Sequence, residues 1–178
     1  MEKLCIELKE EVEIIPISKS DLPRAIFDST ERYRYWWARQ WNKDLPIANF
    51  VMLNPSTADA KRSDPTVTRC HRYVERWGFG SLIVTNIFAY RSTDPKQLRL
   101  VDDPIGEETD DYIIRAADLS DLIVVAWGVH GDHLGRGHDV LSLLCDRHLF
   151  ALGTTKSGSP RHPLYLASNL LPNAYNVE

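Results

Sequence analysis

The sequence predicts an α/β fold, a three-layer sandwich around a central, mainly parallel four-stranded sheet with an N-terminal β extension. Four short apolar runs, of the kind found in strands buried on both faces, occur after residue 46. Helical stretches separate these runs, and alternation of strand and helix is typical of a parallel sheet covered by helices on both faces. The 178 residues suit one domain, with the β extension at 1–45 and the core at 46–168.

Composition and charge exclude several classes of protein. The formal net charge of −4 argues against a non-specific nucleic-acid coat protein, and any polyanionic partner should dock on the first half of the chain, where basic residues concentrate. The three cysteines, Cys5, Cys70 and Cys145, form neither a disulfide framework nor a CxxC metal motif, which indicates a cytoplasmic protein. No secretory leader and no run long enough to cross a bilayer occurs, so we expect no membrane partner.

The elements before residue 80 are predicted from hydrophobic period and from start signals. Residues 2–41 alternate charged and apolar positions, which indicates half-buried strands. The apolar members of this pattern are Leu4, Ile6 and Leu8, then Tyr33, Tyr35 and Trp37. IANFVML at 47–53 is the first core strand, and Asp64 followed by Pro65 predicts the cap and first residue of a helix. The apolar face of this helix carries Val67, Cys70, Val74 and Trp77.

The remaining elements continue the alternation. SLIVTNIF at 81–88 is the second core strand, and Asp103–Pro104 is expected to open a second helix. The inward face of that helix should carry Ile113, Ile114 and Ala117. DLIVVAW at 121–127 is the third strand, a helix is expected from about 136 to 145, and HLFALG at 148–153 is the fourth strand.

The candidate ligand site is the set of loops that follow these strands, because ligands of parallel α/β sheets bind beyond the carboxyl ends of the strands. Amide and imidazole groups there suit a planar heterocycle, and aromatic rings could stack on it. The candidate residues are Asn54, Pro55, Ser56 and Thr57; Asn86, Phe88, Tyr90 and Arg91; Trp127 and Gly128; and Lys156 and His162. The alternative for Asn54–Pro55–Ser56 is an ordinary exit from a strand into a turn.

Other chemistries have weaker signals. The GxxxxGK[ST], GxGxxG and GxSxG motifs are absent, which argues against P-loop, dinucleotide-binding and serine-hydrolase sites, and we expect no cofactor. The weak metal candidates are His130, His133 and His138, whose alternative role is a flexible, solvated loop. Cys70 is expected in the core.

Four motifs, LNPST, TNIFAYRSTDP, VVAWG and GSPRHPLYL, occur one after another along the chain. They occur in the same order in the family known as domain of unknown function 1643, which the chain resembles from about Ile26 to Leu166. The same motifs more remotely resemble the uracil-DNA glycosylase superfamily. That resemblance implies a parallel four-stranded α/β sandwich that extracts a base and hydrolyses its N-glycosidic bond. The sequence departs from it where Leu164–Tyr165 replaces the Ser-Pro that follows His-Pro in that superfamily.

The glycosylase resemblance implies a role for each matching residue. Asn54 would hold a water against the anomeric carbon, Asn86 would select the base, and His162 would stabilise the leaving base. Leu164 or Tyr165 would fill the gap left by a flipped nucleotide. Asp59 or Asp64 could act as the general base, although Asp64 is better explained as a helix cap. Phosphates could contact Lys61, Arg62, Arg69, Arg72 and Arg76.

The sequence therefore predicts three candidate functions. The leading one is a protein that binds a nucleobase-containing ligand, a nucleic acid or a nucleoside or nucleotide, and hydrolyses an N-glycosidic bond. The second is a non-catalytic nucleic-acid or protein interaction module on the same scaffold. The third is a metal-dependent hydrolase that uses the His130–His138 loop.

Overall fold

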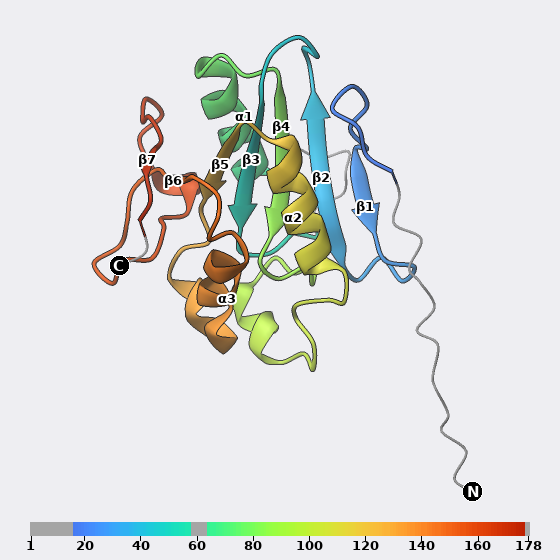
Figure 1. Ribbon diagram of the computed structural model, residues 1–178. Helices are drawn as coiled ribbons and strands as arrows, with labels where there is room; N and C mark the ends of the chain where they lie inside the picture. The colour runs from blue at the N-terminus through green and yellow to red at the C-terminus, as the bar shows by residue number, and fades with distance from the viewer. Residues whose placement is uncertain (1–15, 58–63, 177–178) are drawn as a thin grey trace, which may run out of the picture.

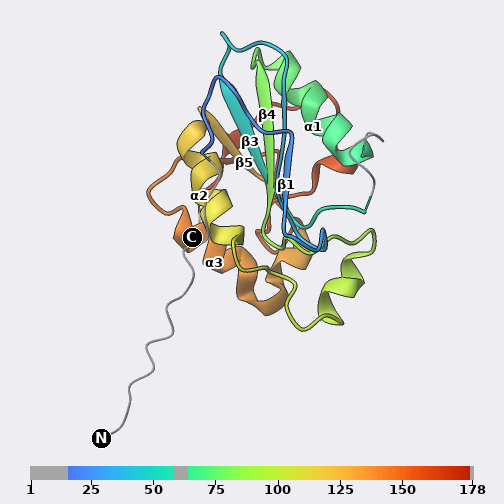
Figure 2. The same cartoon turned by 90° about the vertical axis from the view of Figure 1, so that its right-hand side faces the viewer.

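The computed structural model describes residues 16–57 and 64–176 and places them around one seven-stranded sheet with helices on both faces (Figures 1 and 2). The strands are β1 (Ala25–Phe27), β2 (Arg34–Gln40), β3 (Ile47–Met52), β4 (Ser81–Asn86), β5 (Leu122–Val125), β6 (Leu149–Ala151) and β7 (Asn173–Ala174). The helices are α1 (Pro65–Arg76), α2 (Thr109–Leu119) and α3 (Arg136–Leu143), with 3-10 turns at Pro95–Arg99, Val129–Gly135 and Pro163–Tyr165. The predicted α/β class is confirmed.

The sheet order is β1-β2-β4-β3-β5-β6-β7. Strands β4, β3, β5 and β6 are parallel neighbours, whereas β1, β2 and β7 join the sheet antiparallel. All six residues of β3 are buried, as expected for a central strand covered on both faces. The predicted N-terminal extension corresponds to β1 and β2, and its expected part at Leu4, Ile6 and Leu8 lies outside the described residues. Strand β7 was not predicted, because its two residues are both exposed and carry no periodic signal.

Two layers of helix cover the sheet (Figure 2). Helix α1 packs on one face, where Cys70, Tyr73 and Val74 join a core cluster with Phe50 and Val84. Helices α2 and α3 pack on the opposite face, over clusters that contain Val51, Ile83 and Val125 among others. None of the helices in the described part of the chain is long and apolar enough to span a bilayer.

The start of α1 follows the prediction, but the start of α2 does not. The Asp64 carboxylate accepts a hydrogen bond from the Thr66 amide at 2.7 Å, and Pro65 is the first helical residue. Helix α2 begins at Thr109 instead of Asp103. The Asp103 carboxylate accepts from the amides of Ile105 and Gly106 and so closes a turn that precedes the helix.

The buried face of α2 also differs in one residue. Ile113 and Ala117 are buried as predicted, whereas Ile114 is only half-buried. Tyr112 and Ala116 complete the buried face in its place. The later start of the helix does not alter its 3.6-residue period, so these buried residues still form one stripe along it.

A β-bulge in β2 changes which side chains share a face. Strand β1 pairs Ile26 with Trp36 and Phe27 with Arg34, which leaves Tyr35 without a partner. Tyr35 and Trp36 therefore both contribute to the cluster beneath α2, whereas Trp37 packs on the α1 side. The predicted alternation of Tyr33, Tyr35 and Trp37 on one face is wrong for this reason. The bulge also turns Arg34 away from the α2 side.

Arg136, the first residue of α3, connects three elements on the α2 side. Its side chain is buried, and Nε donates to the Ile87 carbonyl oxygen just beyond β4 at 2.8 Å. Its guanidinium group also bonds to the Asp110 carboxylate of α2. A buried guanidinium is tolerated when its donors have acceptors, so Arg136 fixes α2 and α3 against the end of β4.

We predict that Arg136→Met lowers the free energy of unfolding by about 2–3 kcal/mol, because it removes charge-assisted hydrogen bonds and leaves the Ile87 carbonyl unpaired. Urea denaturation checks this value. Arg147→Met is the matched control: Arg147 pairs with Asp118 at 2.6 Å on the surface, and its loss should change the free energy by less than about 1 kcal/mol. Equal losses in both variants would contradict the structural role assigned to Arg136.

Candidate functional site

The parallel pairing of β3 with β4 brings two polar loops together where both strands end. Beyond the pair Met52–Asn86, the ladder continues with the Ile87 amide donating to the Met52 carbonyl at 2.8 Å. The two chains stay close farther along, where the Ser92 amide donates to the Pro55 carbonyl at 2.9 Å. The hydroxyl groups of Thr57 and Thr93 also hydrogen-bond, at 2.7 Å. The predicted loops 54–57 and 86–92 therefore lie side by side.

Asn54 is held in one orientation by backbone carbonyls. Its Nδ2 donates to the Ser92 carbonyl at 2.8 Å and to the Pro55 carbonyl at 3.2 Å. Both amide protons are thereby engaged, and Oδ1 accepts no hydrogen bond within the described residues. The half-buried Asn54 thus offers one oriented acceptor, suited to hold a water or a ligand N–H.

Asn86 ends β4 with its side chain on the α1 side of the sheet, the side that Leu82 and Val84 occupy earlier in the strand. The residue is 3% exposed, and its Nδ2 has no hydrogen-bond partner among the described residues. A buried donor without an acceptor costs about 1–3 kcal/mol. A ligand carbonyl placed beside Nδ2 would remove that cost.

His162 lies on the segment that runs past the end of β5. The Gly128 amide donates to the Pro160 carbonyl at 2.7 Å, and a Cβ built on Gly128 would lie 3.6 Å from the Cβ of His162. Gly128 has φ +72°, a conformation that favours glycine. A Cβ at residue 128 would only touch His162, so the positive φ, and not a lack of space, is what favours glycine here.

The imidazole of His162 is suited to donate from Nε2. Its Nδ1 accepts a hydrogen bond from the Leu164 amide at 3.4 Å, so the proton of the neutral ring lies on Nε2. Burial lowers the pKa of His162, and the nearby Asp64 carboxylate offsets part of this effect. A neutral ring with a free Nε2–H can stabilise negative charge that develops on a ligand.

Asp64 links α1 to the Asn54 loop. The Ser56 hydroxyl donates to one carboxylate oxygen at 2.5 Å, while the other caps α1. Burial alone would raise the pKa of Asp64, but hydrogen bonds from Ser56, Thr66 and Val67 together hold it below its ordinary value. The predicted cap is confirmed. The other expected general base, Asp59, lies outside the described residues, as do Lys61 and Arg62.

Arg34 belongs to this region and was missed from the sequence. The residue is 7% exposed, and burial lowers the pKa of its guanidinium to about 10, an effect that Asp64 partly offsets. Its side chain forms no ion pair or hydrogen bond with any residue that the structure describes. An alternating strand predicts an ordinary surface arginine here. The bulge at Tyr35, which has no sequence signature, is what turns Arg34 toward the site.

Two predicted aromatic ligand contacts lie in the core instead. Phe88 is fully buried on the α2 and α3 side, and Trp127 is buried in the same cluster. The Trp127 ring packs so close to Gly131 that a Cβ there would lie 2.1 Å from it. Neither ring is open to a ligand, because Phe88 is 0% and Trp127 is 3% exposed.

The other loop candidates are divided between the site and the periphery. Tyr90 is half-buried and lies edge-on to Tyr33, with ring centroids 5.8 Å apart. Lys156 is exposed in the 154–160 loop. Leu164 is half-buried, whereas Tyr165 is 88% exposed just after His162 and Pro163. Tyr165 is thus the aromatic ring that remains free to stack on a base.

The arginines of α1 have different surroundings. Arg72 is exposed, and the Arg69 guanidinium lies 5.7 Å from the centre of the Tyr73 ring. Arg76 donates to the Ser168 carbonyl at 2.6 Å and so fastens the C-terminal segment to α1. Among these three predicted phosphate contacts, Arg72 has its charge free of any described partner.

The three histidines proposed as metal ligands do not form a cluster. His130 and His138 are exposed, whereas His133 is half-buried with Nε2 3.2 Å from the Leu98 carbonyl oxygen. Within residues 16–57 and 64–176, no group of three or more His, Cys, Asp or Glu side chains could hold a metal ion. Cys70 is buried as predicted, and burial raises the pKa of its thiol.

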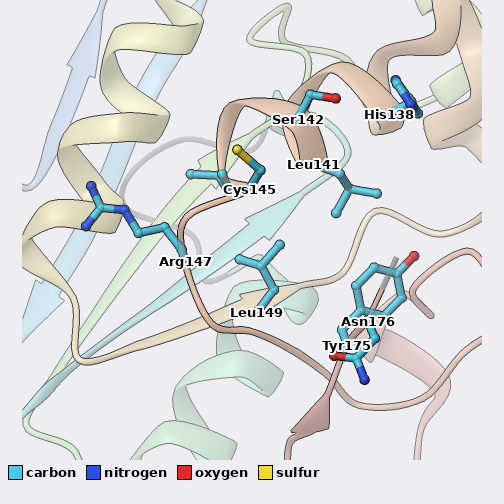
Figure 3. A pocket seen from close by; sticks show the side chains of 9 residues that line it. His138, Leu141, Ser142, Cys145, Arg147, Leu149, Tyr175 and Asn176 are labelled. Atoms are coloured by element: carbon cyan, nitrogen blue, oxygen red, sulfur yellow. The ribbon is translucent and has the colours of Figure 1, made fainter. Parts of the chain in front are cut away.

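A separate shallow pocket of about 370 Å³ lies between α3 and strands β6 and β7 (Figure 3). Its apolar wall includes Leu141, Leu149 and Tyr175, and His138 and Cys145 lie at its rim. Leu149 is the first residue of β6, so this pocket adjoins the amino end of that strand and not the carboxyl edge. Asn54, Asn86 and His162 are not among the residues that line it.

One comparison with known proteins identifies the family. The family model described as "Protein of unknown function (DUF1643)" matches residues 34–164, and the chain belongs to this family. The match begins at the first residue of β2 and ends at Leu164, so it includes Asn54, Asn86 and His162 but not Tyr165. No curated protein and no solved structure gives a significant match.

We predict that Asp64→Ala lowers the free energy of unfolding by about 1 kcal/mol at pH 7, since it removes the cap of α1. The folded protein holds the pKa of Asp64 below that of the unfolded chain, so this stabilisation is present at neutral pH and is lost as the pH falls below about 4. Urea denaturation of both proteins at pH 7 and pH 3 tests the sign. A gap that widens at pH 3 would contradict it, and Asp102→Ala on the exposed 102–103 turn is the control.

Proposed function

We propose that the protein binds a nucleobase-containing ligand at the carboxyl edge of the sheet, on the α1 side, and hydrolyses its N-glycosidic bond. The observation that carries this proposal is a set of three polar atoms without partners among the described residues. They are Oδ1 of Asn54, Nδ2 of Asn86 and Nε2 of His162. Each follows a different strand, and a planar base with carbonyl and N–H edges can pair with such groups.

Each group has a distinct part in the proposed reaction. Asn86 donates to a carbonyl of the base, and Asn54 Oδ1 accepts a hydrogen bond from a water near the anomeric carbon. As the C–N bond breaks, the Nε2–H of His162 donates to the base and stabilises the charge that develops on it. The water oxygen bonds to the anomeric carbon, and the water proton ends on the base nitrogen, so the products are the free base and the sugar with a new hydroxyl group.

The proposed hydrolysis does not use a general base at this site. An amide orients water but does not take its proton at neutral pH, and the Asp64 carboxylate is already engaged by Ser56 and the α1 amides. The site therefore depends on a sugar that already carries positive character when the water attacks, as in an oxocarbenium-like transition state. Under that condition a positioned water and a stabilised leaving base are sufficient.

The glycosylase-like layout expected from the sequence is part of this proposal. It is supported by four parallel neighbours in the order β4-β3-β5-β6, with α1 on one face and α2 and α3 on the other. The functional groups also follow the strands in the order that the resemblance implies, from Asn54 through Asn86 to His162. This similarity concerns the scaffold, and the chemistry rests on the three groups themselves.

A second candidate, a non-catalytic nucleic-acid module, is favoured by Tyr165. The ring is 88% exposed beside His162, at the position where the sequence departs from the glycosylase pattern. Stacking of a base on an exposed aromatic ring contributes about 1–3 kcal/mol without any reaction. This candidate predicts oligonucleotide binding that Tyr165→Ala weakens and no release of free base.

Base release is the experiment that tests the proposed function. Oligonucleotides and nucleosides carrying uracil, hypoxanthine, xanthine or mismatched thymine are incubated with the protein, and free base is detected by mass spectrometry. We expect release from at least one substrate, and a loss of about 100-fold or more in Asn54→Ala and in His162→Ala. His148→Ala, at an exposed histidine outside the site, is the matched control and should release base at the wild-type rate.

Two outcomes would contradict the proposal. One is the absence of release from every substrate by folded protein that still binds the oligonucleotide, which favours the second candidate. The other is release that persists in both site variants, which would place the reaction elsewhere on the chain or in a contaminant.

A further inference from the structure

We infer that Arg34 and Arg91 form a partly buried anion subsite that takes the phosphate group of the ligand. This inference deepens the proposed function, because it names a second chemical group of the ligand beside the base. Its primary test uses inorganic phosphate, so it can fail or succeed independently of base release.

The backbone brings the two arginines close together at the edge of the sheet. Tyr33 and Tyr90 form an antiparallel bridge, flanked by hydrogen bonds from Arg34 N to the Ala89 carbonyl and from Arg91 N to the Arg32 carbonyl, both 2.9 Å. The rings of Tyr33 and Tyr90 meet on one side of this bridge. Arg34 and Arg91 each lie one residue from this bridge, on neighbouring segments of the chain, so their backbones are close to one another.

Phe27 of β1 is a neighbour of both arginines. It pairs with Arg34 in the register of β1 and β2, and the Arg91 guanidinium carbon lies 5.1 Å from the centre of its ring. Arg34 itself is 7% exposed, and Arg91 is half-buried. An anion bound by these two side chains would therefore be held in a partly dry environment, where charge-assisted hydrogen bonds are strong.

Arg34 lacks the partners that a buried arginine has elsewhere in this protein. Arg136, equally buried, donates to the Ile87 carbonyl and pairs with Asp110. Arg34 is 7% exposed and has neither a carbonyl nor a carboxylate partner within the described ranges. A buried cation without an acceptor is costly to the folded state. A ligand anion would supply the missing acceptor.

Arg91 also has a hydrogen-bond donor that is not used. Its Nη1 donates to the Glu31 carbonyl at 2.7 Å, while its buried Nε has no acceptor in the part of the chain that the structure describes. The positive charge of Arg91 is also felt by Arg34, whose pKa it helps to lower. An anion between the two guanidinium groups would relieve their repulsion and satisfy both sets of donors.

The geometry favours phosphate and places it beside the proposed reaction centre. Two planar guanidinium groups present several N–H donors that match the oxygens of a phosphate. The Asp64 carboxylate is close enough to affect both Arg34 and His162. The anion subsite and the imidazole therefore both lie near Asp64, so a nucleotide could place its phosphate at Arg34 and its base at His162.

Binding of inorganic phosphate tests the subsite directly. Thermal unfolding of the full chain is followed in rising phosphate, against sodium chloride of equal ionic strength to remove general screening. We expect phosphate to raise the Tm of the wild-type protein, with the affinity reduced about tenfold or more in Arg34→Gln. Arg39→Gln is the matched control, an exposed arginine on the same strand that should respond like wild type.

The variants distinguish a binding role from a structural one. Because Arg34 is buried without a partner, we expect Arg34→Met to unfold at the same or a higher Tm than wild type when no anion is present. Arg34→Lys keeps the charge but loses the paired donors, so it should retain a weakened phosphate response even if a neutral variant folds poorly. An unchanged phosphate response in both Arg34→Gln and Arg34→Lys would overturn the subsite.

A second arm identifies the source of the phosphate. The four common nucleoside 5′-monophosphates are compared with their nucleosides and with an unphosphorylated single-stranded tetranucleotide. Arg34-dependent binding of monophosphates alone indicates a terminal phosphate, and Arg34-dependent binding of the tetranucleotide indicates a backbone phosphate. Binding that is independent of Arg34 in every case contradicts the inference, even if base release is observed.

Discussion

The parallel pairing of β3 with β4 on one side and with β5 on the other is the interaction on which the candidate site depends. Because these strands run in the same direction, the chain leaves all of them at one edge. The burial of every residue of β3 fixes this arrangement, since a shift in register would expose apolar side chains. Asn54 and Asn86 take their places from this pairing, and Gly128 brings His162 to the same edge.

Several polar groups at this edge differ from Arg136 and Asp64 in how far their hydrogen bonds are satisfied. Arg136 and Asp64 are surrounded by acceptors or donors that satisfy them, and both hold elements of structure together. Asn86, Arg91 and Asn54 keep a donor or an acceptor without a partner in the described residues. Local departures from full satisfaction are expected at functional sites, where a ligand completes the hydrogen bonding.

Much of the fold could be predicted because its signals are local. The four buried runs identified the core strands, and Asp64 followed by Pro65 identified the start of α1. The position of the site loops at one edge of the sheet could be predicted from the parallel direction of the strands alone. What the sequence lacked were signals for tertiary effects: the bulge at Tyr35 that turns Arg34, and the packing that directs Phe88 and Trp127 into the core. Asp103 resembled a helix cap because an Asx turn uses the same carboxylate-to-amide bonds.

The central claim is that the ligand binds at the carboxyl edge on the α1 side, and NMR chemical-shift mapping tests it most directly. The protein, labelled with ¹⁵N, is titrated with the nucleosides and nucleoside monophosphates, and the side-chain amide of Asn86 is assigned with the Asn86→Asp variant. We expect the Asn86 side-chain amide to shift together with backbone amides at 54–57 and 161–164. Shifts confined to the pocket at Leu141 and Tyr175, with the Asn86 amide unmoved, would contradict the account.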